Sequence, residues 1–251
     1  MKKLFFKVLV ILIVFIPLAA FAHSLIFPHE TRAIFIDFSN FKRNGRIYYH
    51  PDTPQEKIDS LHTLIELGAE RIVALYGQKT SYPKFIYCDR EEDFLKYSMS
   101  STVPALAHLK LGSYIILGKD GIDINIIAHE LSHAELYERL GFFKRLAVPA
   151  WFDEGLAMQV DRRSYYSEKN LRIKTRDFQE LPDVKIMNDL RTFQSGTRED
   201  IMLHYMAAKY EVGKWYSQEK LIQLINHIKL GNTFYEAFHT MELNETALIK
   251  E

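Results

Sequence analysis

The distribution of apolar and polar residues predicts strands in the first half of the chain. Four stretches are rich in the β-branched and aromatic side chains typical of strands: residues 31–38, 46–50, 83–88 and 114–117. Among them, Thr53-Pro54-Gln55-Glu56 combines a cap, a first-turn proline and a capping-box glutamate, and apolar residues at helical spacing extend this helix to Gly77. A shorter helix is expected around residues 91–97.

Helices dominate the second half. Asp123 can cap a helix that ends near Gly141, and another helix begins after Pro149. A polar stretch rich in Arg and Tyr precedes the last helices, which are expected near residues 200–215, 219–228 and around Phe234. Because the strands come first and most helices afterwards, the pattern favours an α+β fold over an alternating α/β fold, with residues 23–251 forming a single domain.

The first 22 residues have the pattern of a leader. Lys2 and Lys3 form a basic start, an apolar run follows, and Ala20-Phe21-Ala22 is the small-x-small pattern that signal peptidase accepts. An uncleaved anchor is the alternative, because residues 4–22 are 19 residues long if Lys7 snorkels, enough to span a bilayer. Both alternatives export the domain to the periplasm or the extracellular space, and the second tethers it to a membrane.

Composition narrows the classes of function. Of the 251 residues, 47% are hydrophobic and 25% charged, as in a folded protein with a substantial core. The net charge is zero, so nothing indicates a nucleic-acid partner. Cys88 is the only cysteine, which excludes an internal disulfide and a cysteine-rich metal site.

The sequence HELSH, residues 129–133, is the strongest candidate for chemistry. His129 and His133 are four residues apart and therefore share one helix face, from which both imidazoles can bind one ion. Glu130 is displaced around the helix, beside the ion, where a carboxylate can take a proton from an activated water. This is the H-E-x-x-H arrangement of zinc hydrolases.

A catalytic zinc needs a third protein ligand. A metzincin would supply a histidine at the position of Arg139, with a glycine at that of Leu136, so this class is excluded. An aspartate from a later segment is one remaining source. Glu154, 21 residues after His133, is the best candidate, and its neighbour Asp153 is expected to point elsewhere.

HELSH followed by PAWFDEGLA resembles the gluzincin, or thermolysin-like, metallopeptidases, and in particular the bacterial peptidase-MA-like domains. The resemblance covers about residues 83–160. It implies a zincin-like fold, in which the H-E-x-x-H helix lies between a small mixed sheet and a mainly helical C-terminal half. It also implies zinc ligands at His129, His133 and Glu154, with Glu130 as general base.

The resemblance further implies that the strand at residues 114–117 is the sheet edge along which an extended peptide pairs. Thermolysin has an aspartate four residues after its ligand glutamate, where this chain has Met158, so the carboxylate that orients a ligand must come from elsewhere; Asp161 is a candidate. Gluzincins stabilise the oxyanion with a Tyr or His from a downstream helix, for which Tyr205 and His204 are the candidates, with Tyr210 behind them.

These observations predict an exported zinc metallopeptidase that hydrolyses peptide or protein substrates. The alternative is a zinc-binding domain without turnover, anchored at a membrane as an interaction module. An intramembrane protease is excluded, because Glu135, Glu138 and Arg139 follow the motif at once and no apolar span surrounds it.

Overall fold

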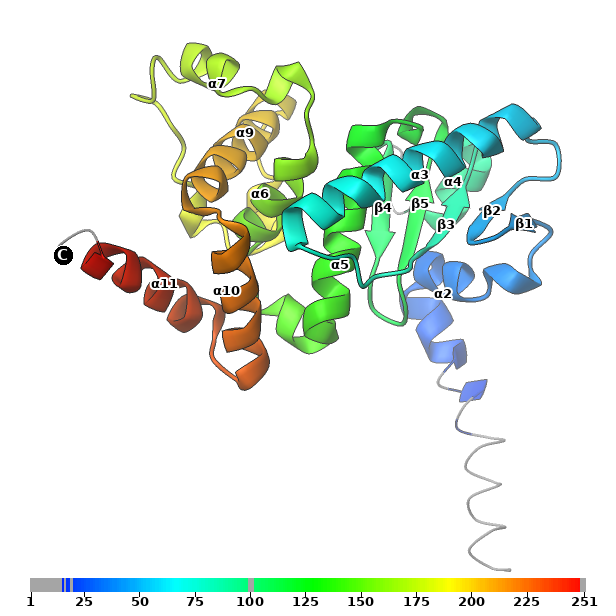
Figure 1. The fold of residues 1–251 in the computed structure, drawn as a ribbon. Coiled ribbons are helices and arrows are strands. Elements are labelled where there is room, and N and C mark those ends of the chain that lie inside the picture. Colours follow the sequence, from blue (N-terminus) through cyan, green and yellow to red (C-terminus); the bar gives the residue numbers. More distant parts are fainter. Residues whose placement is uncertain (1–14, 16, 19, 99–101, 249–251) are drawn as a thin grey trace, which may run out of the picture. The chain divides into compact units, whose positions relative to one another are not determined.

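The computed structural model describes residues 15, 17–18, 20–98 and 102–248, and these divide into two compact units (Figure 1). The sheet unit comprises Met1–Pro54 and Lys84–Asp120, and the helical unit comprises Gln55–Pro83 and Gly121–Glu251. Each unit is therefore built from two separate pieces of the chain. The expectation of one domain over residues 23–251 stays a prediction.

The sheet unit contains a small mixed sheet of five strands in the order β1-β2-β3-β5-β4. The pairs β2/β3 and β3/β5 are parallel, whereas β1/β2 and β4/β5 are antiparallel. The strands are β1 (Lys42–Asn44), β2 (Ile47–Tyr49), β3 (Lys84–Tyr87), β4 (Ala105–His108) and β5 (Tyr114–Leu117), and the unit also holds α2 (Pro28–Ile34) and α4 (Glu91–Tyr97). The mixed α+β class is thus confirmed, as are three of the four predicted strands.

The edge strand was predicted wrongly. β5 pairs with β3 on one side and with β4 on the other, so among the described residues the edge strands are β4 and β1. The chain turns back between β4 and β5 at Gly112, whose φ of 112° is easily adopted only by glycine. The sequence did not predict β4, because its four residues, ALAH, directly after Pro104, include no β-branched or aromatic side chain other than His108.

The strand expected at residues 31–38 is also wrong. This stretch belongs to α2 and to the 3-10 turn Ile36–Phe38. Pro28 occupies the first turn of the helix, a start signal that outweighs the β-branched content. The buried residues Glu30, Ala33 and Ile36 recur every third position, which is a helical period rather than the alternation of a strand.

The helical unit begins with α3 (Gln55–Tyr76), which packs on α5 (Ile124–Leu146). Gly68 of α3 permits this contact, because a Cβ there would lie 3.2 Å from Leu131 Cδ1. The remaining helices are α6 (Ala150–Val160), α7 (Glu168–Lys174), α8 (Leu190–Phe193), α9 (Arg198–Trp215), α10 (Gln218–Leu230) and α11 (Phe234–Leu248). Figure 1 shows α6 between α5 and α9, and its residues are almost all buried.

The motif helix is interrupted at Gly141, where its end was predicted, but helical structure resumes after this residue. Gly141 has φ 73° and ψ 169°, which interrupts α5 before a last short helical segment that carries Arg145. Most of the predicted leader, residues 1–14, 16 and 19, lies outside the described residues. Within the described part of the chain, no helix has the length and apolar character needed to cross a membrane.

A buried carboxylate fixes α5 against the segment that follows α3. Glu135 is completely buried and accepts hydrogen bonds from Thr80 N at 2.9 Å, Ser81 N at 2.8 Å and Arg139 Nε at 2.8 Å. Burial raises the pKa of Glu135, but the hydrogen bonds from Ser81 and Thr80 lower it overall. The folded state therefore favours the ionised form.

Replacing Glu135 by Ala leaves these donors buried without an acceptor. We expect the free energy of unfolding to fall by roughly 3 kcal/mol, measured by chemical denaturation. Glu138→Ala, an exposed position on the same helix, is the control and should change little. Because the folded pKa of Glu135 lies below the unfolded one, its contribution is complete at neutral pH and disappears as the pH falls through the folded pKa. An equal effect of both substitutions would contradict this assignment.

Candidate metal centre

The helix that carries the motif starts from a defined cap. Asp123 accepts hydrogen bonds from the backbone N–H groups of Asn125 at 2.7 Å and Ile126 at 3.3 Å, as predicted. Ile127 and Leu131 then fill the core, which turns His129 and His133 to the opposite side of α5. The motif histidines therefore face α6, which carries Glu154.

Three ligand atoms converge between α5 and α6. His129 Nε2 lies 3.2 Å from His133 Nε2 and 3.3 Å from Glu154 Oε2, and His133 Nε2 lies 3.5 Å from the same oxygen. Apart from the two imidazoles, this buried oxygen has no hydrogen-bond partner among the described residues. The structure thus brings together the three predicted ligands in an arrangement that could hold one metal ion.

The charges of the site favour a cation. Burial raises the pKa of Glu154, but the facing imidazoles of His133 and His129 hold it well below its usual range. Burial lowers the pKa of His133, and the neighbouring Asp153 and Glu154 carboxylates raise it well above its ordinary value. Both shifts favour an ionised Glu154 beside the two imidazoles, and a charge in such a poorly hydrated place needs a partner.

Glu130, the predicted base, is buried beside the triad and is not one of its three members. Burial raises its pKa, while the imidazoles of His129 and His133 lower it by a smaller amount. A carboxylate whose pKa is raised toward neutrality is suited to accept a proton and release it again. A dication on the triad would act in the opposite direction on the pKa of Glu130.

Asp153 contacts the Nδ1 atom of His133, the ring nitrogen that is not directed at Glu154. Its Oδ1 atom lies 2.8 Å from His133 Nδ1, and its Oδ2 atom accepts a hydrogen bond from Arg145 Nη2 at 2.5 Å. Asp153 thus points to another side than Glu154 and is not one of the three candidate ligands, but it still contacts the histidine pair. Neighbouring residues on α6 diverge by about 100°, but an imidazole has a nitrogen on each side of its ring, so Glu154 and Asp153 reach opposite sides of one histidine.

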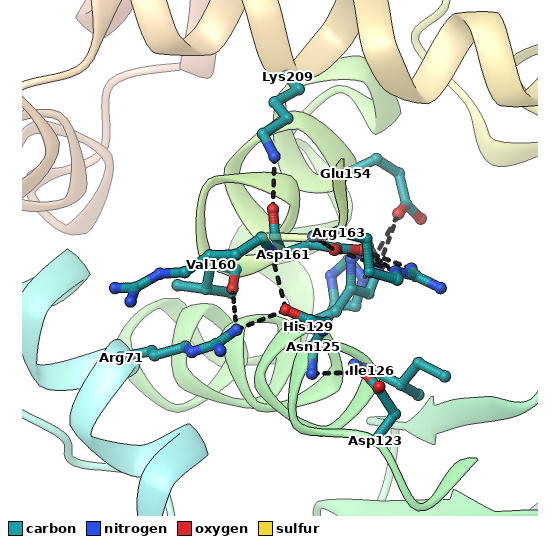
Figure 2. Close-up of polar contacts among 12 residues, drawn as sticks. Arg71, Asp123, Asn125, Ile126, His129, Glu154, Val160, Asp161, Arg163 and Lys209 are labelled. Atoms are coloured by element: carbon teal, nitrogen blue, oxygen red, sulfur yellow. Dashed lines mark hydrogen bonds and ion pairs between the residues drawn. The ribbon is translucent and has the colours of Figure 1, made fainter. Parts of the chain in front are cut away.

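Asp161 does not take this role. Its carboxylate accepts hydrogen bonds from Arg163 Nε at 2.9 Å and from Arg163 Nη2, and its backbone oxygen accepts one from Lys209, as Figure 2 shows. His129 lowers the pKa of Asp161, which places the two groups within electrostatic range, but no hydrogen bond joins them. The buried Nδ1 atom of His129 has no hydrogen-bond partner in the described structure.

A second polar network joins α5 and α6 at the other end (Figure 2). Asn125 Oδ1 accepts hydrogen bonds from Arg71 Nη1 at 2.8 Å and from Arg162 N at 2.9 Å. The same Arg71 nitrogen donates to Val160 O at 2.8 Å. These bonds connect α3, the start of α5 and the end of α6, and so limit how far the two ligand-bearing helices can move apart.

Of the downstream candidates, Tyr205 is the one that faces the triad. Its ring centroid lies 6.2 Å from that of His129. Burial raises the pKa of Tyr205, and Glu154 and Glu130 raise it further, so the phenol remains a hydrogen-bond donor. His204 instead bonds Phe193 O through Nδ1 at 2.7 Å, and Tyr210 stacks on Phe178 with ring centroids 4.6 Å apart.

Gly155 explains how Tyr205 reaches the site. A Cβ on Gly155 would lie 2.6 Å from Ala208 O and 2.6 Å from Val212 Cγ2, so only glycine lets α9 approach α6 this closely. Tyr205 lies one helical turn before Ala208. The glycine that follows the ligand glutamate therefore sets the distance from the triad to the helix that carries the phenol.

Sequence reasoning missed Asp153 and Arg145 as supporting residues. The available signals were an acidic residue directly before the ligand glutamate and a basic residue in the last turn of α5. Neither signal shows that the chain bends at Gly141 to bring the two together. No protein-family profile matches the chain, and no curated protein or solved structure matches it. The functional proposal therefore depends on the residues and their geometry.

Replacing Asp153 by Asn should weaken metal binding without removing a ligand. We expect the affinity for zinc to fall by about 10- to 100-fold, because His133 loses the charge that orients its ring and raises its basicity. Competition with a chromophoric chelator measures this. Asp161→Asn is the control, since Asp161 is likewise an aspartate paired with an arginine, is even more buried than Asp153, and does not bond a histidine. An equal loss in both variants would indicate general destabilisation.

Replacing Gly155 by Ala should push α9 away from α6. We expect the free energy of unfolding to fall by about 1–3 kcal/mol, since the clash is with backbone and a branched side chain. Gly213→Ala is the control on α9, because its Cβ would meet only the Gln159 side chain, at 3.4 Å. Denaturation curves of the two variants provide the comparison, and coincident curves would contradict the close approach at Gly155.

Proposed function

We propose that the protein is an exported zinc metallopeptidase of the gluzincin type, with a zincin-like fold. The observation that carries this proposal is the triangle of ligand atoms. Atoms about 2.0–2.1 Å from a tetrahedral zinc would be about 3.3–3.4 Å apart, and the three distances are 3.2, 3.3 and 3.5 Å. Two imidazoles and one carboxylate are also the ligand set of a known class of catalytic zinc sites. The residues present fit this ion.

When bound, zinc would supply Lewis-acid chemistry, which lowers the pKa of water and polarises a carbonyl. In the proposed reaction, the Glu130 carboxylate accepts a proton from the attacking water. The water oxygen bonds to the peptide carbon, the C–N bond breaks, and Glu130 returns the proton to the leaving nitrogen. The products are a carboxylic acid and an amine, and Glu130 ends in its starting state.

Tyr205 is proposed to donate a hydrogen bond from its hydroxyl to the developing oxyanion. Its position 6.2 Å from the His129 ring, centroid to centroid, supports this role, as does a pKa that keeps the phenol protonated. Asp153 and Arg145 hold the His133 ring in orientation. A site that only retained a metal would have no chemical need for a buried base and a phenol beside it.

Export is proposed from the leader pattern of residues 1–22, and no nucleic acid is involved. The substrate class is an extended peptide or protein segment. If the same centre held zinc without turnover, the chain would instead be a membrane-anchored interaction module.

The first test is the metal content of the purified protein beside that of Glu154→Ala. We expect one zinc per chain in the wild type and its loss in the variant, because two histidines alone leave the site open. Absence of metal in the wild type, even after zinc is offered at neutral pH, would contradict the proposal.

The second test separates binding from catalysis with a peptide library. Glu130→Gln should keep its zinc while kcat falls by about 10²- to 10⁴-fold, the contribution typical of a general base. Tyr205→Phe should lower kcat with zinc retained. His204→Phe, on the same helix, is the control, and its folded fraction should have nearly the kcat of the wild type. Zinc bound by a wild type that cleaves no library member would favour the interaction module.

A further inference from the structure

The sheet unit exposes large apolar side chains close to its N-terminal helical residues. We call this set the apolar collar; its members are Leu25, Ile26, Phe27, Phe35, Phe38 and Leu111. Phe38 is 86% exposed, Leu25 68% and Leu111 61%. Single exposed apolar residues are common on protein surfaces, whereas a group of them near one feature marks an interaction site.

Contacts within the unit bring the Phe27 and Leu111 regions of the collar together. The Lys110 ammonium lies 3.8 Å from the centroid of the Phe27 ring, and His23 and Leu111 line one small pocket. The loop between β4 and β5 is thus beside the helical residues that follow the apolar leader segment. Phe35 and Phe38 come directly after α2, with ring centroids 6.2 Å apart.

The collar does not serve the core of the sheet unit. In the stretch after Pro28, the core positions are taken by Ala33 and Ile36, both almost fully buried. Phe35 and Phe38 alternate with them and face outward. Phe35 and Phe38 are exposed beside Arg32 and Asp37, so two large aromatic side chains face solvent where an ordinary surface helix has polar ones.

The charge of this region differs from that of the rest of the chain. Residues 23–50 contain four lysines and arginines and two acidic residues, Glu30 and Asp37, a net charge of +2, and Lys2, Lys3 and Lys7 of the leader bring residues 1–50 to +5. Because the whole chain is neutral, residues 51–251 carry −5. Aromatic and aliphatic side chains combined with positive charge are the composition of a surface that binds anionic phospholipids.

We propose that the apolar collar lies against a phospholipid bilayer, with its side chains in the headgroup region. Leu25 and Ile26 follow the apolar leader segment, residues 8–22, after only two residues, so a leader retained as an anchor would hold the collar at a lipid surface rather than at another protein. The sheet unit then has a contact of its own with the membrane, in addition to any tether through the leader. This inference does not depend on the proposed peptidase activity.

Spin labelling of the full-length protein in vesicles tests the proposal. Cys88 is 1% exposed, so nitroxide labels attach only to introduced cysteines, here in Phe38→Cys and Leu111→Cys. Lys119→Cys is the matched control: it follows β5, whereas Leu111 precedes that strand, so the two lie at opposite ends of the sheet. The vesicles contain phosphatidylcholine and phosphatidylglycerol, and the probes are collisions with oxygen and with a water-soluble nickel complex.

We expect the labels at 38 and 111 to lose most of their collisions with the nickel complex and gain collisions with oxygen. The label at 119 should remain accessible to the nickel complex. If a collar label is as accessible to the nickel complex as the control, the bilayer contact is absent and the proposal is wrong. Spectral broadening at 38 and 111 that disappears on dilution with unlabelled protein would show that a second copy covers the collar, which also overturns it.

Discussion

One constraint governs how α5 and α6 pack: the candidate ligand atoms of His129, His133 and Glu154 lie within 3.5 Å of one another. Two of them come from successive turns of α5 and are fixed by helical geometry alone. The third comes from α6, so its position depends on how α6 lies against α5. The bonds of Asn125 and Arg71 hold the helices at one end, and those of Asp153 hold them close to the ligands.

This constraint has an electrostatic cost that the surrounding residues reduce. Glu130, Asp153 and Glu154 are carboxylates in one water-poor region, and ionised groups there are unfavourable unless paired. Arg145 forms an ion pair with Asp153, whereas among the described residues only the two imidazoles lie within ion-pair distance of Glu154. A dication held by the three candidate ligand atoms would supply a counter-charge to these carboxylates. Such an ion would stabilise the folded state, because the three atoms come together only there.

Much of the site could be predicted because its information is local. The four-residue spacing of His129 and His133 and the cap at Asp123 need only the geometry of one helix. Residues whose roles depend on a second element were harder to assign. The contact of Asp153 with His133 could not be predicted from α6 alone, because it depends on where the His133 ring lies. Tyr205 could be chosen over His204 only once the orientation of α9 was known. In the sheet, β4 could not be predicted for the same reason, because it is a strand through its pairing with β5 rather than through its own side chains.

The division of the helical unit along the chain governs the order in which its parts become available. A ribosome that has released residues 1–120 has delivered every strand of the sheet, yet α3 still lacks the helix on which its Gly68 face packs. That helix, α5, arrives with the two histidines, and α9, which carries Tyr205, is synthesised later still. Native pairing of α3 must therefore wait for distant sequence, a topology that slows folding. The triad of His129, His133 and Glu154 is therefore complete only after the sheet and α3 have been synthesised.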